Sequence, residues 1–252
     1  MEYPYSRDYL EDVLVRFAYH STGIEGNTLS LNDTRLILQF GQVPSTAGHS
    51  LREVYEVDNH RQAFDYLFQE ASDQRPFSPF LVRNFHQLLT DHILPNAGQY
   101  KTTPNYIVGA NFQTAEPFEV PAKIQKWCDE LNAQFSQAKT TKEVLTVLLE
   151  KHIEFEKIHP FSDGNGRTGR MLINYGLVLK HEPLLVIERE NRDEYIRYEV
   201  NEDVSGLVKY AQQKLAPEKE RMLNFYQTAE QIEKFQKQEE KRLAKPTNQT
   251  KN

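Results

Sequence analysis

Apolar residues recur through most of the chain at the three- and four-residue spacing of amphipathic helices, and short stretches rich in Ser, Gly and Pro separate them. Ser50-Leu51-Arg52-Glu53 is a capping box, Ser78-Pro79 sets a capping serine before a proline, and Gly41 is placed to end the helix before it. The pattern predicts helices over Asp8–His20, Asn32–Phe40, Ser50–Ala71, Ser78–Ile93, Pro121–Phe135, Thr141–Ile158, Met171–Leu179, a short helix from Asn191, Val204–Leu215 and Pro217–Lys245. This organisation is typical of an all-α fold.

The stretch from Gly98 to Val120 departs from the helical pattern. Tyr106-Ile107-Val108 favours a strand, Gly109-Ala110-Asn111 can turn, and Phe112–Phe118 can return as a second strand. From the pattern alone, a β-hairpin and a surface loop are equally compatible with this segment.

The helix predicted over Met171–Leu179 is apolar almost all round, so we expect it to be buried. Gly164-Asn165-Gly166 opens this helix and presents unpaired backbone N–H groups at the positive end of the helix dipole. Arg167 and Arg170, three residues apart, are expected on one side of its first turns, where they can donate charge-assisted hydrogen bonds. The sequence therefore predicts an anion site, most naturally for phosphate.

Two further residues of the same loop add chemistry to this site. Asp163, just before the turn, is placed to hold Mg²⁺ against phosphate oxygens. His159, at the end of the preceding helix, is the one side chain of the loop that acts as a base near neutral pH. Taken singly, a histidine at a helix end, a Gly-Asn-Gly turn and two arginines are each common without any function. A plain turn, however, does not require all of these residues together in one loop.

Composition narrows the class of protein. With 252 residues the chain forms one large domain or a domain with an appendage, and its formal net charge of −6 leaves no footprint for nucleic-acid binding. The single cysteine, Cys128, excludes an internal disulfide and fits a reducing cytoplasm. The start shows no signal sequence and no run approaches a membrane span, so we expect a cytoplasmic protein without membrane contact.

Residues 159–170, His-Pro-Phe-Ser-Asp-Gly-Asn-Gly-Arg-Thr-Gly-Arg, match the signature His-x-Phe-x-Asp/Glu-Gly-Asn-Gly-Arg-x-x-Arg at every fixed position. The chain thereby resembles the Fic family over roughly His20–Lys209. The resemblance implies an all-α Fic-type bundle with a short β-hairpin flap over the active site, and transfer of AMP from ATP to a protein hydroxyl. It further implies a Fic domain over residues 1–215. The resemblance does not cover the tail, and the pattern of residues 216–252 predicts a charged helical extension.

The resemblance also implies a role for each site residue. His159 would take the proton from the attacking hydroxyl, and Asp163 would hold Mg²⁺, for which Mn²⁺ can substitute. The remaining nucleotide-binding positions would be Gly164, Asn165, Gly166, Arg167, Arg170, Val108, Gly109, Ala110, Asn111, Tyr195 and Asn201. For Tyr195, a core tyrosine on a short helix is an equally good interpretation.

A second motif lies near the start of the chain. Ser21-x-x-x-Glu25-Gly26 is similar to the inhibitory motif of the family, and its N-terminal position resembles the class II arrangement, with an inhibitory segment over about residues 8–27. This implies that Glu25 pairs with Arg170 and removes the cation that should bind the γ-phosphate.

Two alternatives to AMP transfer stay open at this point. Glu25 could activate water to remove AMP from a modified protein, or the chain could be a non-catalytic, nucleotide-responsive interaction module. By the resemblance, the partners are ATP and a target protein that binds as an extended segment at the flap. The sequence leaves open the target protein, the acceptor residue and whether the chain forms a homo-oligomer.

Overall fold

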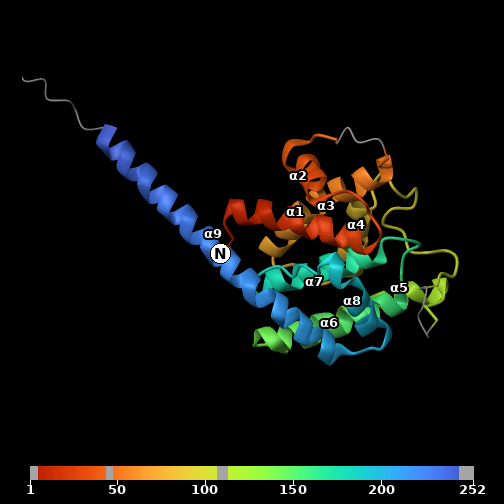
Figure 1. The fold of residues 1–252 in the computed structure, drawn as a ribbon. Helices are drawn as coiled ribbons and strands as arrows, with labels where there is room; N and C mark the ends of the chain where they lie inside the picture. Colours follow the sequence, from red (N-terminus) through yellow and green to blue (C-terminus); the bar gives the residue numbers. More distant parts are fainter. Residues whose placement is uncertain (1–4, 44–47, 107–112, 244–252) are drawn as a thin grey trace, which may run out of the picture.

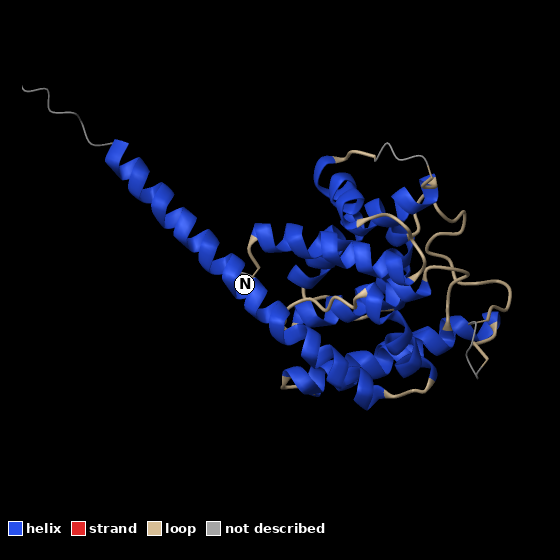
Figure 2. Cartoon of the chain, viewed as in Figure 1, coloured by secondary structure: helices blue, strands red, loops and turns tan. Residues whose placement is uncertain are grey.

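The computed structural model describes residues 5–43, 48–106 and 113–243, and in this part of the chain every regular element is helical (Figures 1 and 2). The α-helices are α1 Arg7–Ile24, α2 Leu31–Phe40, α3 Leu51–Ser72, α4 Pro79–Leu89, α5 Val120–Gln137, α6 Thr141–Ile158, α7 Asn165–Leu179, α8 Arg192–Val200 and α9 Val204–Leu243. Short 3₁₀ turns, η1 Pro117–Glu119 and η2 Arg189–Asn191, precede α5 and α8. The predicted all-α class is confirmed.

Local capping sets most of these boundaries. The Ser50–Glu53 capping box opens α3, Ser78 caps α4 ahead of Pro79, and Gly41 ends α2 in the left-handed conformation with φ 61°. The helix predicted over Thr141–Ile158 has these same ends in the structure. These features depend on residues a few positions apart, which is why the sequence predicts them.

The buried helix predicted from the apolar run is α7, which lies in the middle of the bundle (Figure 1). It contacts α6, α4, α3 and α1, and every residue from Arg167 to Val178 is buried. Since its first turn belongs to the phosphate-site motif, the surrounding helices fix the position of that motif at one end of the packed core.

The segment expected to form a β-hairpin is different in the described residues. Gln113–Glu116 is a loop and Pro117–Glu119 is a 3₁₀ turn, so the return strand predicted over Phe112–Phe118 is wrong from Gln113 onward. The proline and the reciprocal bonds between Glu116 and Glu119 favour a turn that leads into α5. Residues 107–112, which include the predicted turn of the hairpin, lie outside the described residues.

Two helices differ from their predicted form. α4 ends at Leu89 and not at the predicted Ile93; Phe85 and Leu89 are buried, whereas Phe80 is 70% exposed because it lies in the first turn, at the edge of the packing surface. The two helices predicted over Val204–Leu215 and Pro217–Lys245 are one continuous helix, α9, with Pro217 inside it.

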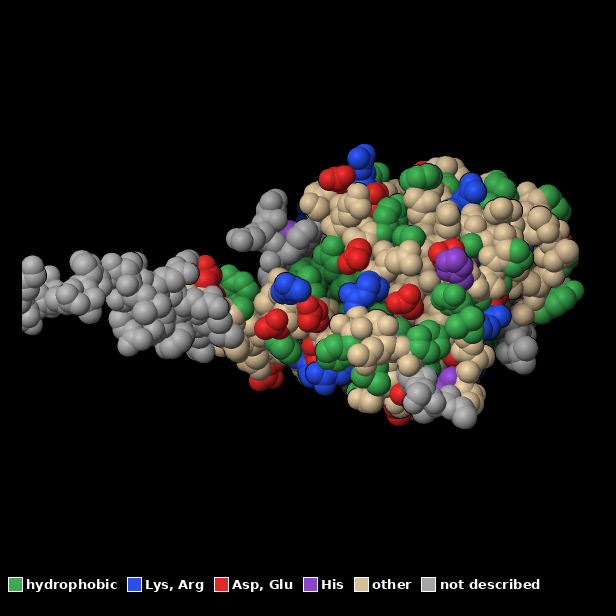
Figure 3. Space-filling view, turned by 90° about the horizontal axis from the view of Figure 1, so that it is seen from above, with side chains coloured by type: hydrophobic (Ala, Val, Ile, Leu, Met, Phe, Trp, Pro, Cys, Tyr) green, Lys and Arg blue, Asp and Glu red, His purple; other side chains and the backbone are tan. Residues whose placement is uncertain are grey.

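The first half of α9 packs on α6 and α8, and Met222 is the last buried apolar residue among those of the helix whose side chains the structure describes. From there the helix runs away from the body (Figure 1), so its charged half is not laid along the core. On the face shown in Figure 3, acidic and basic side chains are interspersed over the described residues. Within the described ranges, no helix has the length and apolar character needed to cross a membrane.

Candidate active site

The loop between α6 and α7 is held by two residues in the left-handed region. His159 ends α6 with φ 48°, which is a sparsely populated conformation for a residue with a side chain, and Gly164 precedes α7 with φ 77°. A Cβ on Gly164 would also collide with Thr90 and approach His86. The backbone therefore makes its sharp turn where only glycine fits.

His86 of α4 stabilises this loop by ring stacking and hydrogen bonds. Its ring stacks on Phe161 at 3.7 Å between centroids, and its Nδ1 accepts from the Gly98 N–H at 2.9 Å. The other nitrogen, Nε2, must then donate to the Asp163 carbonyl 3.0 Å away. Burial lowers the pKa of His86 to about 4, which keeps the ring in this neutral tautomer near pH 7.

Three more contacts secure the loop backbone. The Lys101 N–H donates to the Pro160 carbonyl at 2.8 Å, and the Asn105 amide donates to the Phe161 carbonyl at 2.8 Å. The Asn165 side chain accepts from the Phe161 N–H and donates to its carbonyl, both at 2.9 Å. The Asn165 amide group is thus committed to the loop, so at this residue the backbone N–H, and not the side chain, can bind an anion.

The hydrogen bond of His159 determines which ring nitrogen can act as a base. Nδ1 lies 3.2 Å from the carbonyl oxygen of Glu156. A carbonyl can only accept, so Nδ1 carries the proton of this bond, and in the neutral ring Nε2 keeps its lone pair. With 19% of the side chain exposed, Nε2 is the atom placed to accept a proton from a bound group.

Asp163 is an ionised carboxylate with a cation at its side. Arg52 of α3 donates to Oδ2, the Gly164 N–H donates to Oδ1 at 2.7 Å, and Arg167 lies 3.7 Å away. Burial raises the pKa of Asp163, but Arg167 and Arg52 outweigh it and leave the pKa below its ordinary value. A partly exposed, ionised carboxylate beside a phosphate site fits one protein ligand of Mg²⁺, provided that the half-exposed Arg52 moves aside.

The two arginines of the motif point to different helices. Arg167 is 1% exposed and lies 3.7 Å from Glu56 of α3, and its Nε and Nη1 have no hydrogen-bond partner. Arg170 donates to the Ser21 hydroxyl at 3.0 Å, to the Ser21 carbonyl at 2.9 Å and to Glu25 Oε1 at 2.7 Å. In this conformation the two arginines have different partners, because Arg167 is next to α3 and Arg170 is next to the end of α1.

The carboxylate of Glu25 lies over the first turn of α7. A Cβ added to Gly166 would clash with Glu25 Oε1 and lie 2.9 Å from Arg170 Nη1. Glycine therefore allows a carboxylate to approach the backbone at the positive end of the helix, where a phosphate would otherwise be stabilised. Burial opposes the charge of Arg170, but Glu25 outweighs it and keeps the pKa of the guanidinium above its ordinary value.

Side chains after Glu25 connect the segment to α3. The Asn27 amide donates to Glu56 at 3.0 Å, and the Thr28 N–H and hydroxyl donate to Glu53 at 2.9 and 2.6 Å. Hydrogen bonds from Thr28 and Ser50 lower the pKa of Glu53 to about 2. The end of α1 is thereby fixed against the helix that also carries Arg52.

Some predicted site residues are not gathered here. Tyr195 is 1% exposed and its hydroxyl lies 2.6 Å from His152 Nε2, so it offers no surface to a ligand in this conformation. Asn201 is an exposed residue after α8. The four flap positions, Val108, Gly109, Ala110 and Asn111, lie outside the described residues.

Several residues around the site were missed from the sequence, among them His86, Arg52 and Glu56. They come from helices far away in the chain, and no local motif distinguishes them. His152 and Glu156 carried a usable signal, because both lie one or two turns before His159 on the same helix. Their ligand atoms and those of Glu199 lie within 4.8 Å of one another, but His152 Nε2 is already occupied by hydrogen bonds, so we assign no metal to this group.

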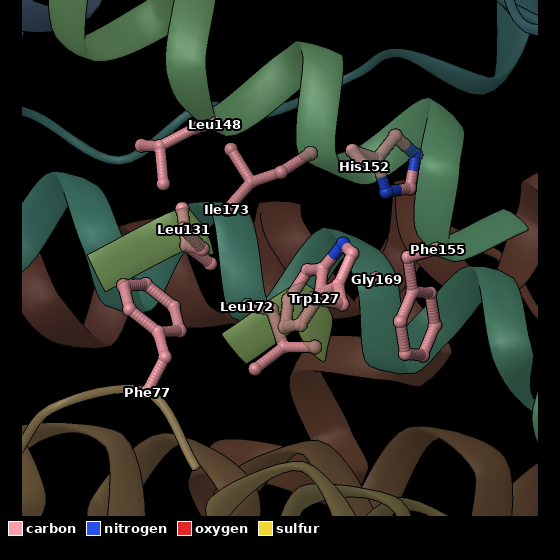
Figure 4. A pocket seen from close by; sticks show the side chains of 9 residues that line it. All are labelled: Phe77, Trp127, Leu131, Leu148, His152, Phe155, Gly169, Leu172 and Ile173. Carbon is pink, nitrogen blue, oxygen red and sulfur yellow. The ribbon is translucent and has the colours of Figure 1, made fainter. Parts of the chain in front are cut away.

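A small cavity lies deeper in the core, between α5, α6 and α7 (Figure 4). Its volume of about 10 Å³ holds at most one water molecule, far less than a nucleotide needs. Its lining is mainly apolar and consists of Phe77, Trp127, Leu131, Leu148, His152, Phe155, Gly169, Leu172 and Ile173. The cavity is therefore not the substrate site, which we place at the open end of α7.

Known proteins are similar to this chain in sequence. The Fic/DOC family model matches residues 76–177. The protein adenylyltransferase fic-1 of Caenorhabditis briggsae is 31% identical over 192 residues, and that of Caenorhabditis elegans is 30% identical over 194 residues. Each alignment covers 75% of this chain, which spans only 36% of either relative.

Solved structures agree on the fold. A Fic domain containing signaling protein from Bacteroides thetaiotaomicron superposes with a TM-score of 0.78 and 26% identity, covering 88% of this chain and 90% of that one. Fic-1 (residues 134–508) from C. elegans superposes with a TM-score of 0.70 and 26% identity, covering 90% of this chain and 68% of that one. With the loop motif and its geometry in place, these matches show that the chain belongs to the Fic/DOC family.

Proposed function

We propose that this protein transfers AMP from ATP to a hydroxyl group of a target protein. The observation that carries the proposal is the loop from His159 to Arg170, which joins a base, an anion-binding helix end, a carboxylate and two arginines. The curated relatives are named protein adenylyltransferases, and they support this reaction class. ATP is the AMP donor and the target is a protein with an accessible Ser, Thr or Tyr.

The reaction needs a base and stabilisation of phosphate charge. The hydroxyl oxygen bonds to the α-phosphorus, the bond to the bridging oxygen of the leaving group breaks, and pyrophosphate departs. His159 Nε2 accepts the hydroxyl proton as this happens. The N–H groups at the start of α7 stabilise the charge on the α-phosphate, and Arg167 and Arg170 bind the outer phosphates.

Asp163 is the residue that would hold Mg²⁺, or Mn²⁺ in its place. When bound, the metal neutralises phosphate charge during transfer. Asp163 is ionised and partly exposed, and Arg52 balances its charge in the absence of a metal. For Asp163 to hold Mg²⁺ through Oδ2, Arg52 would have to leave this oxygen.

Glu25 holds the protein in a low-activity state in this proposal. Its carboxylate pairs with Arg170 at 2.7 Å and lies against Gly166, the position suited to an outer phosphate of ATP. With Arg170 engaged, ATP binds with its α-phosphate misaligned for attack. This role corresponds to the class II inhibitory arrangement, with residues 8–27 as the inhibitory segment of a Fic domain over 1–215.

Labelled ATP tests the proposal. The wild type, Glu25→Gly and Glu25→Gly/His159→Ala are incubated with Mg²⁺ and ATP radiolabelled at the α-phosphate, and label is scored on the protein itself and on lysate proteins. Glu25→Gly should label strongly, the double variant should not, and label at the γ-phosphate should not transfer. Absence of label in Glu25→Gly, with ATP still bound, would favour the non-catalytic interaction module.

Removal of AMP is a second candidate, because Glu25 places a carboxylate 2.7 Å from Arg170 at the reaction centre. In that reaction Glu25 would activate water toward the AMP–protein bond. Incubation of an AMP-modified target with the wild type and Glu25→Gly separates the two: loss of AMP that requires Glu25 supports removal, and persistence of AMP with both proteins opposes it.

A further inference from the structure

A group of buried polar side chains lies behind the loop, where α6, α7 and α8 meet. His152 and Glu156 belong to α6, and Tyr195 and Glu199 belong to α8. His152 Nε2 lies 2.6 Å from the Tyr195 hydroxyl and 2.8 Å from Glu199 Oε1. The phosphate chemistry described above uses none of these four residues, so their burial calls for another explanation.

Glu156 meets His159 with two different groups. Its carbonyl oxygen accepts from Nδ1 at 3.2 Å, and its carboxylate Oε2 lies 3.6 Å from the same nitrogen. The second distance is too long for a hydrogen bond. It is short enough for a substantial interaction between charges once the ring is protonated.

The carboxylate of Glu156 lies in space that Gly169 of α7 leaves open. A Cβ on Gly169 would lie 2.9 Å from Glu156 Oε1 and 2.6 Å from His152 Nδ1. Both atoms are buried and have no hydrogen-bond partner. A buried carboxylate with an unbonded oxygen is costly, so a compensating positive charge nearby is required.

Titratable and charged side chains from all three helices face Glu156. Burial raises the pKa of Glu156, but His159 and His152 on α6 and Arg170 on α7 outweigh it and leave the pKa below its ordinary value. On α8, burial raises the pKa of Glu199 above its ordinary value. Burial also raises the pKa of Tyr195, to well above its usual range. Of the two carboxyl groups, Glu156 is therefore the one whose charged form its surroundings favour, and it is the one next to His159.

We propose that Glu156 is a positioning residue for His159: its carbonyl holds the ring with Nδ1 protonated, and its carboxylate stabilises the imidazolium formed during transfer. The proposal rests on the AMP transfer proposed above. As the hydroxyl oxygen bonds to phosphorus and pyrophosphate leaves, the hydroxyl proton moves to His159 Nε2. The ring then carries a positive charge 3.6 Å from the buried carboxylate.

Glu156→Gln keeps the backbone carbonyl and the side-chain shape but removes the charge. In the Glu25→Gly background we expect kcat to fall about 10- to 100-fold, with the KM for ATP unchanged within a few-fold, because Glu156 contacts no phosphate. The acidic limb of the kcat–pH profile should move to lower pH by about 1 unit. Glu156→Asp should recover part of the rate, and Glu150→Gln, an exposed glutamate of the same helix, should change neither quantity.

An NMR titration of the His159 ring gives a readout that does not depend on transfer. The signal is assigned by its loss in His159→Ala, and its midpoint should move to lower pH by about 1 unit in Glu156→Gln. An unmoved midpoint would overturn the proposal. If Glu156→Gln does not fold, the same titration of Glu156→Asp decides, with a smaller shift in the same direction expected. If the Glu25→Gly parent transfers no AMP, the proposed function fails, and the titration still tests the role of Glu156.

Discussion

Replacement of Glu25 should weaken the fold and raise activity at the same time. Glu25→Gly removes the carboxylate that pairs with Arg170 at 2.7 Å. Arg170 is only 3% exposed, so the loss leaves a buried cation with fewer partners. The same loss frees that cation for the outer phosphates of ATP.

The cost can be worked out from the contacts that remain. Arg170 keeps two hydrogen bonds to Ser21, from Nε and Nη2, so its guanidinium is not left bare. A hydrogen bond to a charged group contributes about 1.5–3 kcal/mol, and the 40% exposure of the Glu25 side chain reduces this to about 1–2 kcal/mol. For a chain of this size, such a loss lowers Tm by about 2–8 °C.

Thermal unfolding and AMP transfer measured on the same samples check this prediction. Glu25→Ala separates the loss of the carboxylate from the added backbone freedom of glycine, and Glu11→Ala, an exposed glutamate of α1, is the control. We expect both Glu25 variants to melt lower than wild type without ligand and to gain more stability from Mg²⁺ with ATP. Transfer should rise about 10²-fold, since correct alignment of a reacting phosphate is worth this much.

The two effects have a common cause, so they must occur together. A Glu25→Gly protein that melts like wild type and transfers AMP no faster would show that the pair with Arg170 does not form in solution. A protein that is destabilised but no more active would show that the pair is structural and that inhibition, if present, acts elsewhere.

Three other predictions follow from the site. His159→Ala should abolish transfer, a loss of roughly 10²–10⁴ in rate, while calorimetry finds ATP affinity within a few-fold of wild type; parallel loss of binding would make the residue structural. Asp163→Ala in the Glu25→Gly background should remove most of the cooperativity between Mg²⁺ and ATP in melting experiments. It should change the ligand-free unfolding free energy by less than about 1 kcal/mol, because the ion pair of Asp163 with Arg52 is partly exposed. A metal effect that survives in this variant would mean that the metal binds elsewhere. Glu53→Gln should lower the unfolding free energy at pH 7 by about 1 kcal/mol. Folding lowers the pKa of Glu53 from 4.5 to about 2, so its contribution to stability is complete above pH 4.5 and is lost as the pH falls toward 2. The unfolding free energies of the variant and the wild type should therefore become equal near pH 2. Glu150→Gln, tested alongside, should show no such pH dependence of its difference from wild type.

Local sequence determined the features that depend on neighbours in the chain. Capping residues placed the starts of α3, α4 and α6, and the apolar run marked α7 as the buried helix. The sequence also predicted the turn before α7, because Gly164 takes a conformation that favours glycine and adjoins an anion-binding helix end. The residues and spacing of the loop therefore predicted both its chemistry and the family.

Tertiary structure decided which partner each of these side chains meets. Spacing on an isolated helix puts Arg167 and Arg170 close together, but packing turns one toward α3 and the other toward α1, where different carboxylates balance their charges. Packing also buries Tyr195, which the sequence left equally open to ligand contact and core. The charge balance of Asp163 by Arg52 and the approach of Glu156 to His159 depend on how loop and helices meet. Periodicity and capping report only on residues a few positions apart, whereas these contacts are set by the mutual orientation of helices that are distant in sequence.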